Sequence, residues 1–240
     1  MIAATLVAAV SAAPFQFSGT LRAGQTLTVN DVQGTIRVRD GDRLTIHADK
    51  HAERSDPSTV QVHVEQRDDG VVVCVRYPPD ADRGCGSYSG RSGSSGNDTV
   101  VDFEITVPRG TALVANTVNG SVDVQHDGSA GATAVNGSVR IDATQISSAK
   151  TVNGGLHLTM RNAERGSLVA TTVNGEVDVQ LPASQGIAVD ARTLTGDISV
   201  PGVSVDRPRY GPGARASGTV GDGALRLRLE SVNGSITVRR

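Results

Sequence analysis

A short motif that recurs through the second half of the chain constrains the fold more than any other feature. The first clear copy, 117–124, runs Thr-Val-Asn-Gly-Ser-Val-Asp-Val, and similar octets recur at intervals to the end of the chain. The central pairs are Asn119-Gly120, Asn136-Gly137, Asn153-Gly154, Asn174-Gly175, Thr195-Gly196 and Asn233-Gly234. Successive pairs are 17, 17, 21, 21 and 38 residues apart, and the last step is close to two ordinary steps. A repeat of this length predicts a solenoid in which each copy forms one coil.

Each copy alternates apolar and polar residues, as a half-buried β-strand does. The inward side chains of the first copy are expected to be Val118, Val122 and Val124, and the outward ones Thr117, Ser121 and Asp123. Asn-Gly interrupts the alternation with the pair that most readily takes positive φ, which predicts a tight turn or corner. The repeated glycines are then backbone requirements and not ligand contacts.

Two architectures fit a strand, an Asn-Gly pair and a second strand. One is a meander or barrel of β-hairpins, for which Asn-Gly is a strong signal. The other is a β-helix, in which equivalent residues of successive coils stack about 4.8 Å apart. The near-identity of the copies favours the coil, because stacking places Val on Val and Asn on Asn. Asparagine amides stacked in this way can hydrogen-bond to one another.

Composition agrees with an all-β coil. Hydrophobic residues make up 38% of the 240 residues, aromatic residues 2%, and tryptophan is absent. Ordinary cores use aromatic side chains heavily, whereas a narrow β-helix interior suits small aliphatic ones. The net charge of −2 gives no general attraction to nucleic acid or anionic membranes. No nucleic-acid partner is therefore expected.

The first residues resemble a secretory signal. Met1 to Ala13 is an apolar run that ends close to an A-x-A cleavage pattern, although it lacks the usual positive n-region. A disordered start or a strand is the alternative. The run is too short for a membrane-spanning helix and has no cysteine to carry a lipid. The expected parts are an export signal at 1–13 and a single β-solenoid domain at 14–240, with an array starting near residue 20, an insertion at about 74–98 and a second loop at about 201–218.

Two cysteines flank a Pro-Pro bend. Cys74 and Cys85 are eleven positions apart, next to a Gly/Ser-rich stretch, and they are not in a C-x-x-C spacing. Free thiols and a redox pair are the alternatives, but a structural disulfide is favoured because no redox motif surrounds either cysteine. A disulfide would fit an oxidising compartment, in the periplasm or outside the cell.

The strand from Val101 to Pro108, the serial copies after it, and Leu181-Pro182 before Thr195-Gly196 resemble the bacterial "putative adhesin" family. This is a β-repeat domain of unknown function in exported or envelope-associated proteins. The resemblance covers roughly residues 20–240 and is most specific over 100–200. It implies a right-handed β-helix-like fold with Asn-Gly corners and a role at the cell envelope. It carries over no catalytic residue, and it does not extend to the cysteine region.

No catalytic, metal or cofactor motif is recognised. Asp123 and Asp178 take equivalent positions, with Arg140 and His157 between them, and this mixed row is typical of a solvated face more than of an acid/base pair. Three histidines, at positions 47, 51 and 63, lack the spacing of a metal site. The glycines fit no phosphate-binding fingerprint, and Gly221-Asp222-Gly223 is only a fragment of a calcium-binding repeat.

These observations favour a non-enzymatic exported solenoid that presents a repetitive surface to an envelope protein or glycan. A polysaccharide-active β-helix enzyme is a second hypothesis, which needs acids and bases converging in one groove. A filament former is a third, in which coils stack end to end through exposed strand edges. The terminal Arg239-Arg240 is expected to oppose such stacking at the C-terminal end. The sequence does not indicate an oligomeric state.

Overall fold

The computed structural model describes residues 10–86, 96–162, 165–209 and 211–240, and the expected all-β fold is confirmed for them. One short 3-10 turn, η1 (Pro57–Thr59), interrupts the strands. The strands of the N-terminal part are β1 (Val10–Ser11), β2 (Phe15–Gly19), β3 (Thr26–Asn30), β4 (Ile36–Gly41), β5 (Leu44–Ala52), β6 (Gln61–Arg67), β7 (Gly70–Arg76), β8 (Val100–Pro108) and β9 (Ala112–Asn116). The strands of the repeat region and of the C-terminal part are β10 (Val122–Thr133), β11 (Val139–Lys150), β12 (Leu156–Met160), β13 (Gly166–Asn174), β14 (Val177–Gln180), β15 (Ile187–Thr195), β16 (Ile198–Ser199), β17 (Val205–Asp206), β18 (Ala214–Val220), β19 (Leu225–Asn233) and β20 (Ile236–Arg239).

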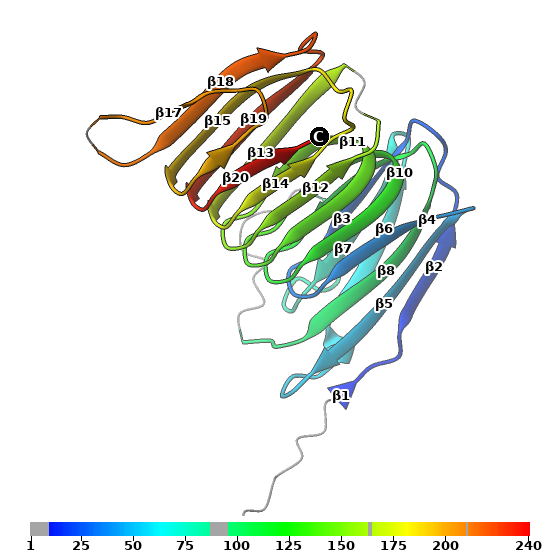
Figure 1. Ribbon diagram of the computed structural model, residues 1–240. Coiled ribbons are helices and arrows are strands. Elements are labelled where there is room, and N and C mark those ends of the chain that lie inside the picture. The colour runs from blue at the N-terminus through cyan, green and yellow to red at the C-terminus, as the bar shows by residue number, and fades with distance from the viewer. Residues whose placement is uncertain (1–9, 87–95, 163–164, 210) are drawn as a thin grey trace, which may run out of the picture.

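The strands form a flattened coil with two faces (Figure 1). The first face has the order β2, β5, β8, β4, β10, β11, β12, β14, β20, β16. The second face has the order β6, β7, β3, β9, β10, β11, β13, β19, β15, β18. β10 and β11 are long enough to cross from one face to the other. Neighbouring repeats pair in parallel, as coils do and hairpins do not.

The repeats do not stack in the order of the chain. Gln33 pairs with Asn119, so the coil built from β3 and β4 lies next to the first clear copy, and the coil of β7 and β8 lies beyond it. At the other end, Asn233 of β19 pairs with Asn174 on one side and with Thr195 on the other. The last coil of the chain is therefore inserted between two earlier ones. The 38-residue step reflects this return and not an unmarked coil.

The segment between residues 201 and 218 is not a loop throughout. β18 pairs antiparallel with β15 over seven residues, and β17 pairs with β18. This hairpin covers the outer edge of β15 on the second face, while the first face ends in the two-residue strand β16. Covered and very short edge strands discourage further strand addition. Arg239 and Arg240 lie on an interior coil, so the expectation that they guard the end of the stack is wrong.

Small aliphatic side chains from both faces form one continuous core between them. Phe103 and Tyr77 are the largest fully buried side chains, and both belong to the N-terminal part. The tyrosine hydroxyl donates to the Thr99 carbonyl (2.8 Å). The repeat region fills its interior almost wholly with Val, Ile, Leu and Ala, because two sheets that are close together leave no room for rings. Of the proposed export signal, residues 1–9 lie outside the described part, and none of the described residues forms a helix suited to crossing a membrane.

Candidate interaction surface

The two faces meet at two long edges. One edge is formed by the Val-Asn-Gly triplets, and we call it the VNG edge; it consists of Val118, Val135, Val152, Val173, Leu194 and Val232 with the Asn, Thr and Gly residues directly after them. The other edge holds the connections from the first face back to the second, and we call it the bend edge. Each edge runs along the whole stack of coils, so each carries a repeated chemistry.

At the VNG edge the residue before each valine is buried. The hydroxyl of Thr151 donates to the Gly137 carbonyl of the neighbouring coil (2.9 Å). The same bond recurs from Thr117 to Gly34, Thr172 to Gly154, Thr193 to Gly234 and Ser231 to Gly175, at 3.4, 3.0, 2.8 and 3.1 Å. These hydroxyls satisfy carbonyls that would otherwise lack a partner inside the corner.

This arrangement overturns the expected orientation of Val118. Thr117 points inward with 3% of its surface exposed, whereas Val118 is 36% exposed. Val122 and Val124 are buried as expected. The alternation changes phase at the corner because the chain bends around Asn119, so that the strands on either side keep separate inside–outside patterns.

The asparagines form the expected ladder of side-chain amides. Nδ2 of Asn136 donates to Oδ1 of Asn119 (2.8 Å), and the same bond links Asn153 to Asn136 and Asn174 to Asn153 at 2.8 Å. Asn233 continues it onto Asn174 (2.9 Å). Each bond uses one of two N–H groups and one of two lone pairs. Every interior amide therefore keeps one donor and one acceptor for a ligand.

The glycine after each asparagine allows the coils to approach closely. A Cβ on Gly137 would overlap the carbonyl of Gly120, and a Cβ on Gly154 would overlap that of Gly137. Without side chains, the Gly137 amide donates to the Asn153 carbonyl (2.9 Å), which continues the backbone ladder through the corner. The need for glycine here is steric and comes from the neighbouring coil.

The valines form an exposed aliphatic row beside the amides. Val118, Val152, Val173 and Val232 are 36–39% exposed, and Leu194 is 50% exposed. Val135 is partly exposed. Apart from Val114, these are the exposed large hydrophobic residues of the described part of the chain. A contiguous row of apolar side chains exposed on a protein surface is typical of an interaction site.

The row ends in an open groove of about 740 Å³ between the VNG edge and the segment before β18. Val173, Leu194 and Val232 line one side, and Pro208 and Pro212 line another. Arginines also line the groove, but they have partners. Arg192 bonds to Asp190 (2.7 Å), which holds the pKa of that carboxyl below its usual range, and Arg207 bonds to Asp197 (2.6 Å). The groove therefore presents a mostly apolar surface with neutralised charges.

The four residues of the predicted polar row stand in register on the first face. Asp123 pairs with Arg140, Arg140 with His157, and His157 with Asp178. Three steps of about 4.8 Å separate the two aspartates by roughly 14 Å, which exceeds the separation used by glycosidases. Arg39 contacts Asp123 (3.3 Å), and Arg239 contacts Asp178 (2.8 Å). Each carboxylate is thus engaged by its own arginine.

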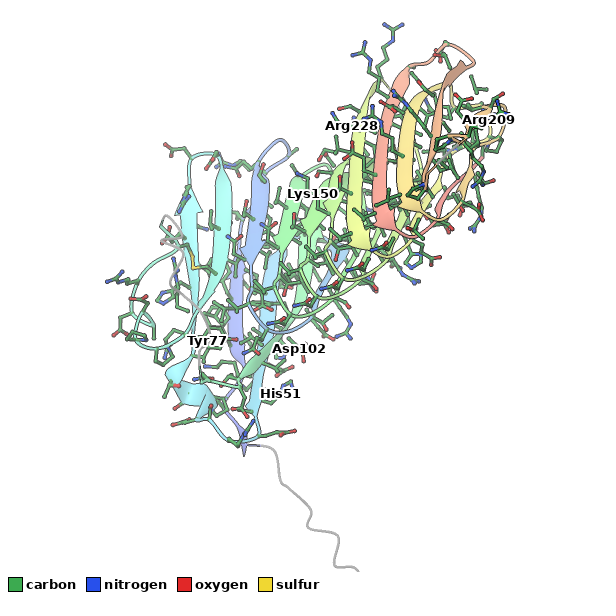
Figure 2. All side chains as sticks on the ribbon, turned by 90° about the vertical axis from the view of Figure 1, so that its left-hand side faces the viewer. His51, Tyr77, Asp102, Lys150, Arg209 and Arg228 are labelled. Atoms are coloured by element: carbon green, nitrogen blue, oxygen red, sulfur yellow. A yellow bond between two sulfur atoms is a disulfide. The ribbon has the colours of Figure 1, made fainter. Side chains whose placement is uncertain are left out.

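The three predicted surface histidines do not come together. His47 and His51 lie on β5, where His47 faces Asp49 (3.2 Å) and His51 faces Asp102 of β8 (3.9 Å). His63 lies on β6 and contacts the Ala81 carbonyl (2.6 Å). Figure 2 shows His51 and Asp102 at one end of the array, with Arg228 and Arg209 at the other. No group of three or more His, Cys, Asp or Glu among the described residues is placed to hold a metal ion.

A buried polar cluster on the bend edge was not expected from the sequence. His126 is fully buried, with Nδ1 on Asp40 Oδ1 (2.7 Å) and Nε2 on the Thr111 carbonyl (2.9 Å). Arg161 contacts Asp127 (2.6 Å) and so joins this cluster at the surface. The only signal in the sequence is His-Asp-Gly at 126–128, where β10 loses register against β11. The cluster joins the first bend to neighbouring strands, and its histidine is buried away from the surface.

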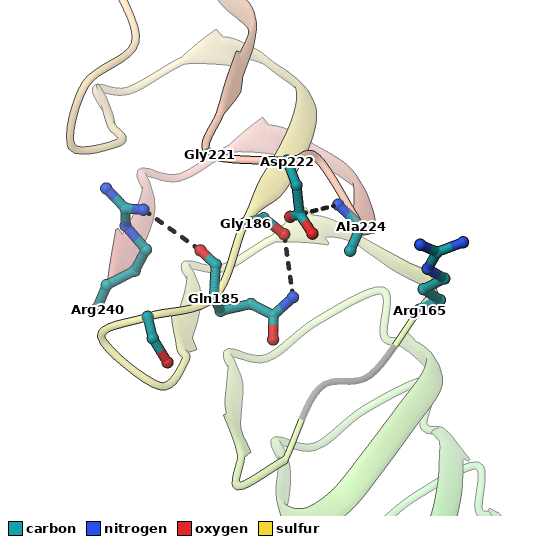
Figure 3. A pocket seen from close by; sticks show the side chains of 8 residues that line it. Arg165, Gln185, Gly186, Gly221, Asp222, Ala224 and Arg240 are labelled. Atoms are coloured by element: carbon teal, nitrogen blue, oxygen red, sulfur yellow. Dashed lines mark hydrogen bonds between the residues drawn. The ribbon is translucent and has the colours of Figure 1, made fainter.

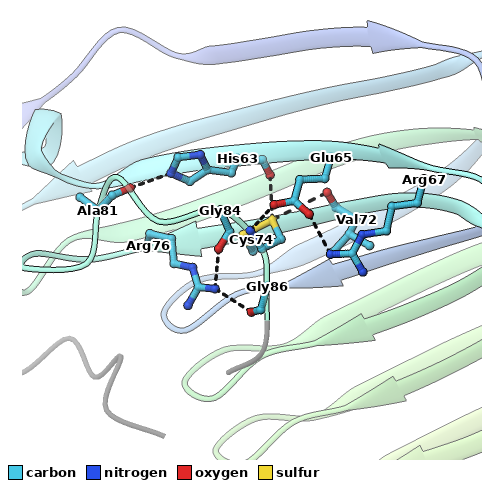
Figure 4. The surroundings of a disulfide bond; sticks show 10 residues. His63, Glu65, Arg67, Val72, Cys74, Arg76, Ala81, Gly84 and Gly86 are labelled. Atoms are coloured by element: carbon cyan, nitrogen blue, oxygen red, sulfur yellow. Dashed lines mark hydrogen bonds and ion pairs between the residues drawn. A yellow bond between two sulfur atoms is a disulfide. The ribbon is translucent and has the colours of Figure 1, made fainter. Parts of the chain in front are cut away.

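Cys74 and Cys85 form the expected disulfide, with Cα atoms 5.6 Å apart (Figure 4). Cys74 lies within β7, so the irregular insertion begins after Arg76, and its residues 87–95 lie outside the described part. The loop folds over β6: Glu65 accepts a bond from the Cys85 amide and pairs with Arg67 (2.7 Å). Arg67 and that amide hold the pKa of Glu65 below its usual range.

The fold and this edge define the chain as a β-solenoid with a side-chain ladder. The family described as Toastrack DUF4097 matches residues 129–239, the part that contains most of the repeats. No curated protein matches the chain. Among solved structures, a "putative cell adhesion protein" from Clostridium sporogenes ATCC 15579 is similar with 14% identity and a TM-score of 0.47, over 94% of this chain and 99% of that one. A "putative adhesin" from Bacteroides fragilis NCTC 9343 is similar with 9% identity and a TM-score of 0.29, over 94% and 96%.

Proposed function

We propose that this chain is an exported, non-enzymatic interaction module of the adhesin type, and that its VNG edge binds an extended glycan of the cell envelope. The observation that carries the proposal is the row of exposed aliphatic side chains beside the amide ladder. Both features repeat at the spacing of the coils, so a linear ligand can make the same contacts several times. Repeated weak contacts on one chain give high total affinity.

The chemistry of the edge favours a glycan over a protein strand. A protein strand would bind by adding to exposed backbone groups, but the backbone amides of the corners already donate to neighbouring coils, as Gly120 does to Asn136 (2.9 Å) and Asn136 to Val118 (2.7 Å). The groups still open to a ligand are side-chain amides and aliphatic surface. Sugar hydroxyls pair with amides, and the C–H faces of sugar rings pack on aliphatic groups.

Export to the periplasm or the cell surface is the second part of the proposal. The disulfide between Cys74 and Cys85 supports it, because such bonds persist in oxidising compartments. The apolar start of the chain supports it too. A right-handed coil with Asn-Gly corners belongs to the same proposal. Filament formation is less well supported, because β18 covers the edge of β15.

The test is co-sedimentation of the purified protein with envelope polymer from the source bacterium, before and after protease treatment of that polymer. The double variant Val152→Ser/Val173→Ser removes two neighbouring aliphatic side chains of the VNG edge. The matched control, Val114→Ser/Val169→Ser, removes two outward valines of the second face. We expect the first variant to lose binding and the control to retain it. The unmodified protein should still sediment with polymer that has been treated with protease. Equal binding of both variants, or loss of binding after protease treatment, would contradict the proposal.

A further inference from the structure

The bend edge carries a cluster of arginines that the proposed function does not use. Arg165, Arg226 and Arg240 line two adjoining hollows of about 620 and 640 Å³ at the C-terminal end of the array. Arg165 and Asp222 belong to both hollows, Arg240 to the first and Arg226 to the second. In Figure 3, Arg240 and Arg165 lie on opposite sides of the first hollow, with Gly186 and Asp222 between them.

These arginines gather at one place and, unlike many arginines of the array, have no carboxylate partner among the described residues. Arg39, Arg161, Arg207 and Arg239 each contact an aspartate within 3.3 Å. Within the described part of the chain, the side chains of Arg165 and Arg226 make no ion pair or hydrogen bond. Arg240 donates to the Gln185 carbonyl (3.3 Å) and to no other described residue. A guanidinium that is not engaged in this way is free to bind an anion in its bidentate mode.

The one acid of the hollows does not cancel this charge. Asp222 accepts a bond from the Ala224 amide (3.1 Å), which holds the turn between β18 and β19. Three arginine side chains face one aspartate side chain, so positively charged side chains are in excess around the two hollows. Gly186 leaves room for Asp222 in the lining of the first hollow, because a Cβ at position 186 would overlap the Asp222 carboxylate. The hollows are thus positively charged and accessible.

We propose that these two hollows bind the anionic groups of an acidic polysaccharide, with Arg165 shared between successive groups. Two hollows in contact suit a polymer that carries carboxylates or phosphates at intervals better than they suit one small anion. No aromatic residue lines either hollow, so the stacking that binds single-stranded nucleic acid is absent from these described residues. The site goes beyond the proposed function, because it lies on the edge opposite the VNG edge.

The experiment is biolayer interferometry of the full chain against polygalacturonate, with neutral dextran, single-stranded DNA and inorganic phosphate as comparison ligands. The variant is Arg226→Gln/Arg240→Gln. The matched control is Arg37→Gln/Arg140→Gln, two exposed arginines of the first face with no ion pair in the described structure. Both double variants change the net charge equally, so they separate a site from general attraction.

We expect the variant to weaken polygalacturonate binding by at least about tenfold, the control to weaken it by less than about twofold, and dextran not to bind. Equal weakening by both variants would overturn the site. Tighter binding of DNA than of polygalacturonate would overturn the ligand class, and so would binding of inorganic phosphate without the polymer. The Val152→Ser/Val173→Ser variant should bind polygalacturonate normally, so failure of this site and failure of the VNG edge are distinguishable.

Discussion

Asp31 breaks the pattern of the VNG edge, and its replacement by threonine tests the interpretation of that edge. Asp31-Val32-Gln33-Gly34 aligns with Thr117-Val118-Asn119-Gly120, because Gln33 pairs with Asn119. Asp31 therefore holds the position of the buried hydroxyls, with 3% of its surface exposed. Neither of its carboxyl oxygens completes a hydrogen bond. In the other coils a hydroxyl at this place donates to a carbonyl, which an ionised carboxylate cannot do.

Burial is the largest influence on this group, and it raises the pKa of Asp31 to about 7 from an ordinary value of 3.8. The negative charge of Asp102 adds to the rise, while the nearby amides of Val32 and Gln33 and the Thr117 hydroxyl oppose it. A difference of about 3 pKa units corresponds to about 4 kcal/mol. Because the folded-state pKa is the higher one, stability is greatest below pH 4, falls between pH 4 and 7, and stays at the lower level above pH 7.

Asp31→Thr is expected to remove most of this loss and to restore the hydroxyl bond, with the Val101 carbonyl as the counterpart of the Gly34 carbonyl. The free energy of unfolding, measured by urea titration with circular dichroism, should rise by up to about 4 kcal/mol at pH 8 and change little at pH 4. Asp31→Asn removes the charge without supplying the hydroxyl and should give a smaller gain. An equal gain at both pH values, or a less stable threonine variant at pH 8, would refute the reasoning.

Three further outcomes are expected from the corners and the disulfide. Asn153→Asp removes the amide donor to Asn136 and should lower the free energy of unfolding by about 1–3 kcal/mol. Asn119→Asp should cost less, because Nδ2 of Asn119 donates to no ladder partner. Denaturant titration compares the two variants, and equal losses would contradict a directional ladder. Gly154→Ala should cost at least about 2 kcal/mol in the same assay because of the Gly137 carbonyl, while Gly86→Ala, which meets open space, should be neutral. Cys74→Ala/Cys85→Ala should lower the free energy of unfolding by about 2–3 kcal/mol and leave the circular dichroism spectrum of the folded protein unchanged. If mass spectrometry of the untreated native protein shows two free thiols, the result argues against the disulfide and against export.

The sequence predicts the coil and the amide ladder because both depend on local identity. A motif that repeats with little change must stack like on like, and the bonds between Asn119, Asn136, Asn153 and Asn174 result from that alone. The outward position of Val118 could not be read from alternation, because the chain bends at the corner and the pattern restarts after it. The available signal was the threonine or serine that precedes the exposed aliphatic residue in nearly every copy, because its hydroxyl is buried.

The spatial order of the coils could not be predicted for a different reason. Corners that are nearly identical can pair with one another in any order, so the repeat contains no information about which coil is whose neighbour. The order depends on the connections: β18 returns antiparallel along β15, and β19 then enters between β15 and β13. The cluster of Asp40 and His126 escaped prediction similarly, because its two halves are 86 positions apart in the chain.

The ends of the amide ladder show how a repeat of interchangeable corners is kept from growing. Asn233 is its last asparagine in space, and the next coil outward has Thr195 in register with it. At the other end, Gln33 takes the place beyond Asn119. Thr195 has no side-chain amide to continue these bonds, whereas Gln33 donates its amide to the Asn97 and Thr99 carbonyls (3.1 and 3.3 Å), where the further coil of β7 and β8 lies beyond it. On the second face, β18 also covers the edge of β15. The substitutions that make these two copies look degenerate in the sequence are therefore the ones that end the asparagine ladder.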